Sequence, residues 1–363
     1  MRTFSRSTHV VAWLLCAVVV AVGVACAPAA AQVPTPRAPE PPVRLRIVGG
    51  LAGVNQFSRH EEPFWTRDLP RLSAGRATAE IVPFDRAGIR APEMLRLVQL
   101  GAVPFGTALL SSSAADVPEL LAPDLAGLNP DMDSLRRAVA SFRPYLEKLL
   151  RDRYAIEVLA VYVYPAQVAY CSKAMTGLAD LAGRRVRVSG PAMADFVTAL
   201  GAVPVQTGFA EIVASMRSAI IDCAITGTMS GNTIGLDRVT SHIHTLPIAW
   251  GVAVFVANGT AWAALPADVQ ALLRKELPRL EQSIWAESER ETADGIACNT
   301  GRDECMGGRK GRMTGVKATP ADQRRSHEIL VGQVLPRWIQ RCGPGCAQVW
   351  RETIGPALGI ALP

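Results

Sequence analysis

The sequence predicts an α/β fold built as two domains, and three observations support this. The chain has 363 residues, which is too many for one small core and suits two domains of roughly 150 residues each. Its hydrophobic fraction of 49% and charged fraction of 19% are typical of a folded protein and exclude general disorder. Segments rich in β-branched residues alternate with helix-forming segments, a pattern typical of strands joined by crossover connections.

The individual elements follow from local signals. Residues 43–47 alternate apolar and basic residues like a strand, and Pro92 stands at the first turn of a helix that ends before Gly101. We expect Ser134 to cap a longer helix. The expected strands are 43–47, 78–84, 103–109, 156–163, 185–188, 203–206 and 220–225, with further extended structure over 239–256. The expected helices are 58–74, 92–100, 134–151, 192–200, 209–218 and 267–296.

The helical stretch 267–296 is the longest expected element. At about 1.5 Å per residue it measures about 45 Å, which is long enough to lie across two domains. Pro278 lies inside this stretch and predicts a kink or a division, because proline lacks the N–H that a continuous helix uses.

The first 31 residues have the organisation of an export signal. Arg2 and Arg6 precede an apolar run over residues 10–27, and small alanines at 29–31 offer a cleavage site. Lipid attachment at Cys26 is one alternative, but Gly23 stands where a lipoprotein signal has a larger aliphatic residue. An uncleaved membrane anchor is a third possibility. Residues 32–42 are rich in proline and predict an extended tether. We therefore expect a periplasmic protein.

Export changes the interpretation of the cysteines. Two of the eight leave with the signal, and an even number of six in an oxidising compartment favours disulfides. The simplest expected pairs are Cys171–Cys223, Cys298–Cys305 and Cys342–Cys346, although six cysteines allow 15 connectivities. A zinc site with four thiolates from the last two pairs is the alternative, disfavoured because exported thiols oxidise.

Composition and motifs exclude several functions. The net charge is +6, but the arginines are scattered, so nucleic-acid binding is not expected. Ser230 stands one place too late for a G-x-S-x-G nucleophile motif, and no phosphate-binding loop or zinc-protease motif is present. His242 and His244 share one face of an expected strand, where a solvent-facing pair is favoured over a metal site without a third ligand. We therefore expect a binding protein without a cofactor, not an enzyme.

Five segments then resemble one family, in its order and at its spacings. Leu178–Val188, with the sequence LADLAGRRVRV, resembles the most characteristic motif of the periplasmic substrate-binding subunits of TRAP transporters, the DctP-like family. The other four similar segments are Glu93–Ala102, Leu200–Val205, Phe209–Asp222 and Trp262–Gln270.

The resemblance implies a periplasmic-binding-protein fold with a hinge and a long helix that spans both domains. It assigns residues 43–163 and 253–291 to the first domain. The second domain takes 164–252 and 292–363, including a cysteine-rich C-terminal elaboration. The family also implies the function: one ligand, most often an organic acid, is enclosed between the domains. The closed protein delivers it to a membrane permease of one small and one large subunit.

The same motif places Arg187 on the arginine that pairs with the ligand carboxylate in the family. A planar guanidinium offers two parallel donors and stays charged when it loses water. The other expected ligand-binding residues are Gln167, where some members carry a second arginine, Thr226, Asn55, Gln56, Ser112, Tyr164 and Trp250. The last two could wall the ligand, although core packing explains buried aromatic residues equally well.

Two other functions stay open from the sequence. The first is an exported binding protein that serves an ATP-driven importer or a sensor. The second, much less favoured, is an exported hydrolase that uses Ser230 or the histidine pair.

Overall fold

The structure is a computed structural model that describes residues 41–362. The expected signal peptide (1–31), the alternative lipid site at Cys26 and most of the tether (32–42) lie outside these residues. Among the described residues, no helix is long and apolar enough to cross a bilayer.

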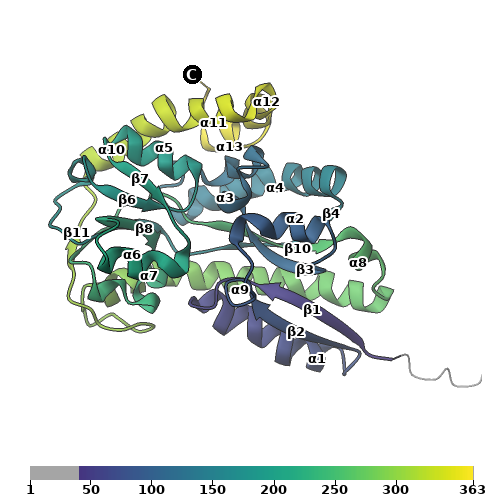
Figure 1. Ribbon diagram of the computed structural model, residues 1–363. Coiled ribbons are helices and arrows are strands. Elements are labelled where there is room, and N and C mark those ends of the chain that lie inside the picture. The colour runs from purple at the N-terminus through teal and green to yellow at the C-terminus, as the bar shows by residue number, and fades with distance from the viewer. Residues whose placement is uncertain (1–40, 363) are drawn as a thin grey trace, which may run out of the picture. The chain divides into compact units, whose positions relative to one another are not determined.

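Two mixed β-sheets form the framework (Figure 1). The first sheet has the order β2 (Ala77–Pro83), β1 (Val43–Gly49), β3 (Phe105–Leu109), β10 (Val252–Asn258) and β4 (Ile156–Val163). The second has the order β11 (Thr314–Val316), β9 (His242–His244), β5 (Gln167–Cys171), β8 (Cys223–Gly227), β6 (Arg185–Val188) and β7 (Val203–Gln206). In each sheet, strands linked by crossovers pair in parallel, as β1 with β2 and β6 with β7. One strand of each sheet runs antiparallel to its neighbours: β10 between β3 and β4 in the first, and β5 between β9 and β8 in the second.

Helices surround both sheets. Before residue 200 they are η1 (Gln56–Glu61), η2 (Phe64–Asp68), α1 (Leu69–Leu72), η3 (Ala91–Glu93), α2 (Met94–Gln99), α3 (Leu110–Ser113), η4 (Pro118–Asp124), α4 (Met132–Tyr154), η5 (Leu178–Leu181) and α5 (Pro191–Ala199). After it come η6 (Phe209–Glu211), α6 (Ile212–Arg217), α7 (Thr228–Ile234), η7 (Leu236–Arg238), α8 (Gly259–Ala263), α9 (Ala267–Asn299), α10 (Pro320–Ile329), η8 (Leu330–Val334), α11 (Leu335–Cys342), α12 (Pro344–Glu352) and α13 (Ile354–Leu358).

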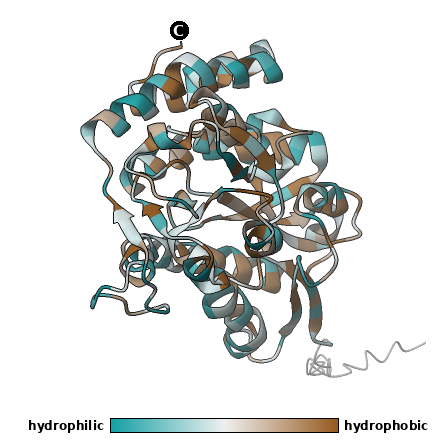
Figure 2. Ribbon diagram, turned by 60° about the vertical axis from the view of Figure 1, so that its left-hand side comes forward, coloured by the Kyte–Doolittle hydropathy of each residue, from teal (hydrophilic) through white to brown (hydrophobic). Residues whose placement is uncertain are grey.

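Apolar residues are concentrated on the strands, and the helices turn polar residues outward (Figure 2). Trp65 is fully buried against Phe255 of β10, with ring centroids 5.0 Å apart. β10 lies between β3 and β4, antiparallel to both, and all but its last residue is buried.

Most expected elements are present, with three corrections at their ends. Asp131, not Ser134, is the N-cap of α4: its carboxylate accepts the N–H of Ser134, whose side chain completes a capping box. β8 starts at Cys223, because Ala219 takes a positive φ of 51° in the preceding turn. The long helix α9 continues through Pro278 to Asn299 without a division.

The α9 helix connects the surroundings of the two sheets. It packs against β4 and η1 on the side of the first sheet and against α7 on the side of the second. In Figure 1 it crosses the picture from beside α8 on the right to the region of α7 on the left. The strands of each sheet follow the expected domain division at 163/164 and 252/253 to within one residue, although the division itself stays a prediction.

The C-terminal helices were not predicted and contact elements beside both sheets. The Trp338 indole of α11 donates to the Pro118 carbonyl oxygen of η4 at 2.8 Å, and Arg341 pairs with Asp195 of α5 at 2.6 Å. α13 packs on α4. The segment assigned to the second domain therefore also contacts the first.

The histidine pair expected to face solvent is a further correction. His244 is fully buried, with Nε2 3.5 Å from Asp322 Oδ2, because β11 and α10 cover the edge of the second sheet. His242 lies on the same strand and contacts the Ser241 hydroxyl.

The three expected disulfides are present: Cys171–Cys223 between β5 and β8, Cys298–Cys305 after α9, and Cys342–Cys346 between α11 and α12. We predict that the exported, unreduced protein has no free thiol when it is denatured and treated with a thiol reagent. Closing the loop of about 52 residues between the first pair stabilises the fold by about 4 kcal/mol through chain entropy. Four reactive thiols together with one equivalent of zinc would contradict the prediction.

Candidate ligand-binding site

A small cavity lies where strand ends and connecting segments of the two sheets meet. Its volume is about 50 Å³. Residues from both sheets' surroundings line it: Leu51, Val54, Leu109, Ser111, Tyr164, Gln167, Arg187, Ser189, Phe209, Thr226, Gly227, Ser230 and Gly251. A volume of this size holds about three to five water molecules, so the cavity suits a small ligand.

Arg187 is the only basic residue in this lining. It projects from β6 and is 5% exposed, and the apolar Val186 and Val188 are buried beside it. Its Nε donates to the Thr207 carbonyl oxygen at 3.1 Å and its Nη1 to the Ile225 carbonyl oxygen at 2.9 Å. These contacts use two of the five guanidinium N–H groups and fix the plane of the guanidinium.

No carboxylate pairs with Arg187 among residues 41–362. Burial lowers the pKa of Arg187 to about 10, against the opposing effect of the Glu211 charge. The side chain therefore stays charged at neutral pH, although a buried cation without an anion is costly. A carboxylate in the cavity would supply that missing anion.

Three other expected residues line the cavity with Arg187. Gln167 begins β5, Tyr164 lies in the link between β4 and β5, and Thr226 lies on β8. The Tyr164 hydroxyl lies close to the Leu51 N–H and the Gln56 side chain, whereas the buried Gln167 Oε1 has no hydrogen-bond partner among residues 41–362. Unpartnered buried polar atoms are rare in folded proteins, so they indicate a site completed by a ligand or by water.

The other four expected residues lie outside the lining. The Trp250 indole is buried and donates to the Asn129 carbonyl oxygen, so it belongs to the core. Gln56 donates to buried Glu61, and Asn55 donates to Glu291 of α9. Ser112 does not line the cavity, whereas its neighbour Ser111, in the first turn of α3, does.

Sequence reasoning missed Ser189 as a lining residue. It follows β6 directly, before Gly190 and the helix start at Pro191. Ligands of α/β proteins collect at the carboxyl ends of parallel strands, so the end of β6 was the signal that could have found it.

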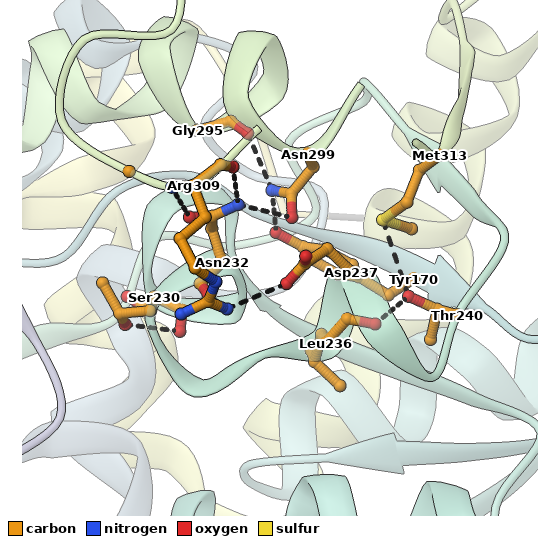
Figure 3. A network of polar contacts seen from close by, with 12 residues as sticks. Tyr170, Ser230, Asn232, Leu236, Asp237, Thr240, Gly295, Asn299, Arg309 and Met313 are labelled. Carbon is orange, nitrogen blue, oxygen red and sulfur yellow. Dashed lines mark hydrogen bonds and ion pairs between the residues drawn. The ribbon is translucent and has the colours of Figure 1, made fainter. Parts of the chain in front are cut away.

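A polar network holds one wall of the cavity against α9 (Figure 3). Asn299 Nδ2 donates to the Tyr170 hydroxyl at 3.0 Å and to the Thr228 carbonyl oxygen at 2.9 Å. Asn232 of α7 donates to the Arg309 carbonyl oxygen and accepts the Arg309 N–H. The first turn of α7, which carries the lining residue Ser230, is thereby fixed to the end of α9.

Glu291 of α9 is 6% exposed, and burial raises its pKa to about 7. Asn55 and Arg59 face it from the η1 side, and Glu287 and Asp294 from α9 itself. A carboxyl group whose pKa is raised on folding stabilises the fold below its ordinary pKa of 4.5, and this contribution is lost as the pH rises through 7.

We predict that Glu291→Gln, which keeps the oxygen that accepts from Asn55, gains stability relative to wild type between pH 5 and pH 8.5. The expected gain is about 2 kcal/mol, measured by denaturant unfolding at both pH values. Glu289→Gln is the control, because this α9 carboxylate is half exposed and pairs with Arg136. A stability difference between Glu291→Gln and wild type that does not change with pH would contradict the prediction.

The residues considered for other chemistry are not assembled into a catalytic or metal site. In the described part of the chain, Ser230 makes no hydrogen bond to a histidine or a carboxylate. The one group with metal-binding spacing there is Asp294, Cys298 and Cys305, whose two sulfurs are joined in a disulfide. A disulfide lacks the thiolates that bind zinc.

Comparison with known proteins identifies the family. The model of the DctP family, bacterial extracellular solute-binding protein family 7, matches residues 63–297, about two thirds of the chain. The chain belongs to this family. Its members are solute-binding receptors, which supports the expected binding role. All five segments that resembled the family lie inside the matched range.

Solved structures of DctP-family receptors share the fold. DctP6 of Bordetella pertussis, a receptor that binds pyroglutamic acid, has a TM-score of 0.76 at 20% identity, over 85% of this chain and 99% of its own. A TRAP periplasmic protein of Desulfovibrio salexigens with bound orotic acid has 0.77 at 15%, over 87% and 98%. Another from Rhodoferax ferrireducens with bound malonate has 0.76 at 18%, over 87% and 98%. The expected periplasmic-binding-protein fold is confirmed.

Proposed function

We propose that this protein captures a small organic acid in the periplasm and delivers it to a TRAP-type secondary transporter. One observation carries the proposal: Arg187 lines the cavity as a buried cation whose hydrogen-bond partners among residues 41–362 are two carbonyl oxygens. A ligand carboxylate would pair with its free N–H groups. The proteins of similar fold that hold pyroglutamic acid, orotic acid and malonate support this ligand class.

The remaining parts of the proposal follow from the family and the N-terminal sequence. Residues 1–31 would export the chain, and the tether would link the folded part to the cleavage site. Domains divided as the sequence predicts would close over the ligand and exclude water, which strengthens its polar contacts. One small and one large permease subunit would accept the closed complex.

A thermal-shift screen against small organic acids tests the ligand class. A ligand at 100 times its Kd stabilises the folded state by about 2.7 kcal/mol, which raises the Tm by several degrees. We expect at least one monocarboxylate to do so for wild type and not for Arg187→Ala. If no organic acid raises the Tm, or if the same shift persists without Arg187, the proposed function is wrong.

A further inference from the structure

The space beside Arg187 adjoins a second chamber that ends at a carboxylate. This chamber has a volume of about 20 Å³ and includes Asp124 in its lining. Four residues line both chambers, which makes the two spaces neighbours: Ser111, Gln167, Ser189 and Gly251. The combined space therefore has a buried cation in one part and an acid in the other.

Asp124 is held firmly in this position at the end of η4. Its Oδ2 accepts the Gly251 N–H at 2.7 Å, and its Oδ1 accepts the Trp250 N–H at 3.0 Å. No cationic side chain pairs with it among residues 41–362. Burial raises the pKa of Asp124 to about 7, against the effect of these backbone N–H groups.

The Trp250 N–H also approaches Oδ2 at 3.1 Å, and the Asn129 side chain and the Val252 N–H lie close to the carboxylate, so protein donors surround much of it but not all. The side chain is partly accessible from the chamber, so a ligand atom can reach it. A ligand that places a hydrogen-bond donor there is favoured, because the donor would meet the Asp124 side chain, a negative or strongly polar acceptor. A second ligand carboxylate is disfavoured, since two like charges in a dry cavity repel strongly.

We infer that Asp124 determines ligand choice: the site takes a small monocarboxylate that carries an N–H or O–H donor on the side away from its carboxylate, and it rejects dicarboxylates. This inference rests on the proposed function and specifies the chemistry of the ligand at the end away from its carboxylate. The size of the space agrees, since both chambers together hold about five to seven water molecules. Gln167, which lines both chambers, is uncharged and so offers no ion-pair partner to a second carboxylate.

Matched ligand pairs test the inference on the wild-type protein by calorimetry at pH 8. The first pair is pyroglutamate and the corresponding lactone, in which oxygen replaces the ring N–H. The second pair is lactate and its 2-fluoro analogue, in which fluorine replaces the hydroxyl, and malonate represents dicarboxylates. We expect the donor-bearing acid of at least one pair to bind about tenfold or more tightly than its partner and than malonate, because an acceptor left unpaired in a buried site is costly.

Asp124→Asn should reduce the preference within that pair to about threefold or less. Asp116→Asn should leave it unchanged, because Asp116 is exposed and lines a separate groove beside α2 and α3. If carboxylates bind but both members of each pair bind within about threefold of each other, or malonate binds as tightly, this inference fails and the proposed function stands. If no carboxylate binds, both fail. The affinities of the wild-type protein for the matched ligand pairs test the inference even if Asp124→Asn does not fold.

Discussion

Replacing Arg187 by alanine should abolish tight ligand binding. The carboxylate would lose its only charged partner in a cavity without room for much water, at a cost of about 3–5 kcal/mol. That cost corresponds to a loss in affinity of at least a few hundredfold. Arg187→Lys should bind with intermediate affinity, since it keeps the charge but loses the paired donors of the guanidinium. Calorimetry with an acid found by screening measures both.

Two further variants separate binding from folding. Arg184→Ala is the control, because Arg184 donates to the carbonyl oxygens of Lys173 and Ala174 and does not line the cavity. Arg187→Met fills similar volume without the charge, so the ligand-free variant should melt at or above the wild-type Tm. If the ligand affinity of Arg187→Ala is within about threefold of wild type, a difference in binding free energy below about 0.7 kcal/mol, Arg187 is not the carboxylate anchor.

Replacing Gly295 by alanine should destabilise the protein strongly and weaken ligand binding. A Cβ at Gly295 of α9 would lie 2.3 Å from the Met229 nitrogen and 2.4 Å from the Thr228 carbonyl carbon, both backbone atoms of α7. Backbone atoms cannot rotate away, so α7 must shift relative to α9. We expect a loss of about 3 kcal/mol in the free energy of unfolding, at the upper end for overpacking. Because Ser230 of α7 lines the cavity, affinity should fall too.

Gly332→Ala is the matched control for this substitution. Gly332 also lies in a helical segment, η8, and a Cβ there would meet no atom within 4 Å. Alanine should be neutral or slightly stabilising at that position, because it restricts the unfolded chain more than glycine does. Equal Tm values for Gly295→Ala and wild type would show that α7 and α9 are not packed as closely as described.

The sequence predicted the fold class well because local signals and long-range packing agree in these segments. The strands 156–163, 185–188 and 203–206 have the bounds of β4, β6 and β7. Their β-branched or alternating residues favour extended structure by themselves and are then covered by helices. The short strand β5 and the helix α7 were missed, because Gln167–Cys171 and Thr228–Ile234 contain no clear periodicity and are fixed by their neighbours instead.

The candidate site was predicted in part. Arg187, Gln167, Tyr164 and Thr226 follow strand ends or a family motif, and all four line the cavity. Trp250 and Asn55 lie in segments that approach the cavity, but their side chains turn to Asn129 and Glu291. The direction of a side chain in a connecting segment depends on partners more than 100 residues away, which local sequence does not encode.

By itself, the sequence predicted an α/β fold with crossover helices, a long helix and, as the simplest pairing, three disulfides. Its resemblance to the family added Arg187 as the expected carboxylate anchor, and that role stays a prediction. Only the tertiary structure decided that Arg187 is buried without an acidic partner from residues 41–362, and that Asp124 lies in the adjoining chamber. Residues 124 and 187 are far apart in the chain, and no local sequence pattern indicates that they lie near the same cavity. Their relation depends on how η4 and β6 pack around the connecting segment at Gly251, and that packing is a property of the whole fold.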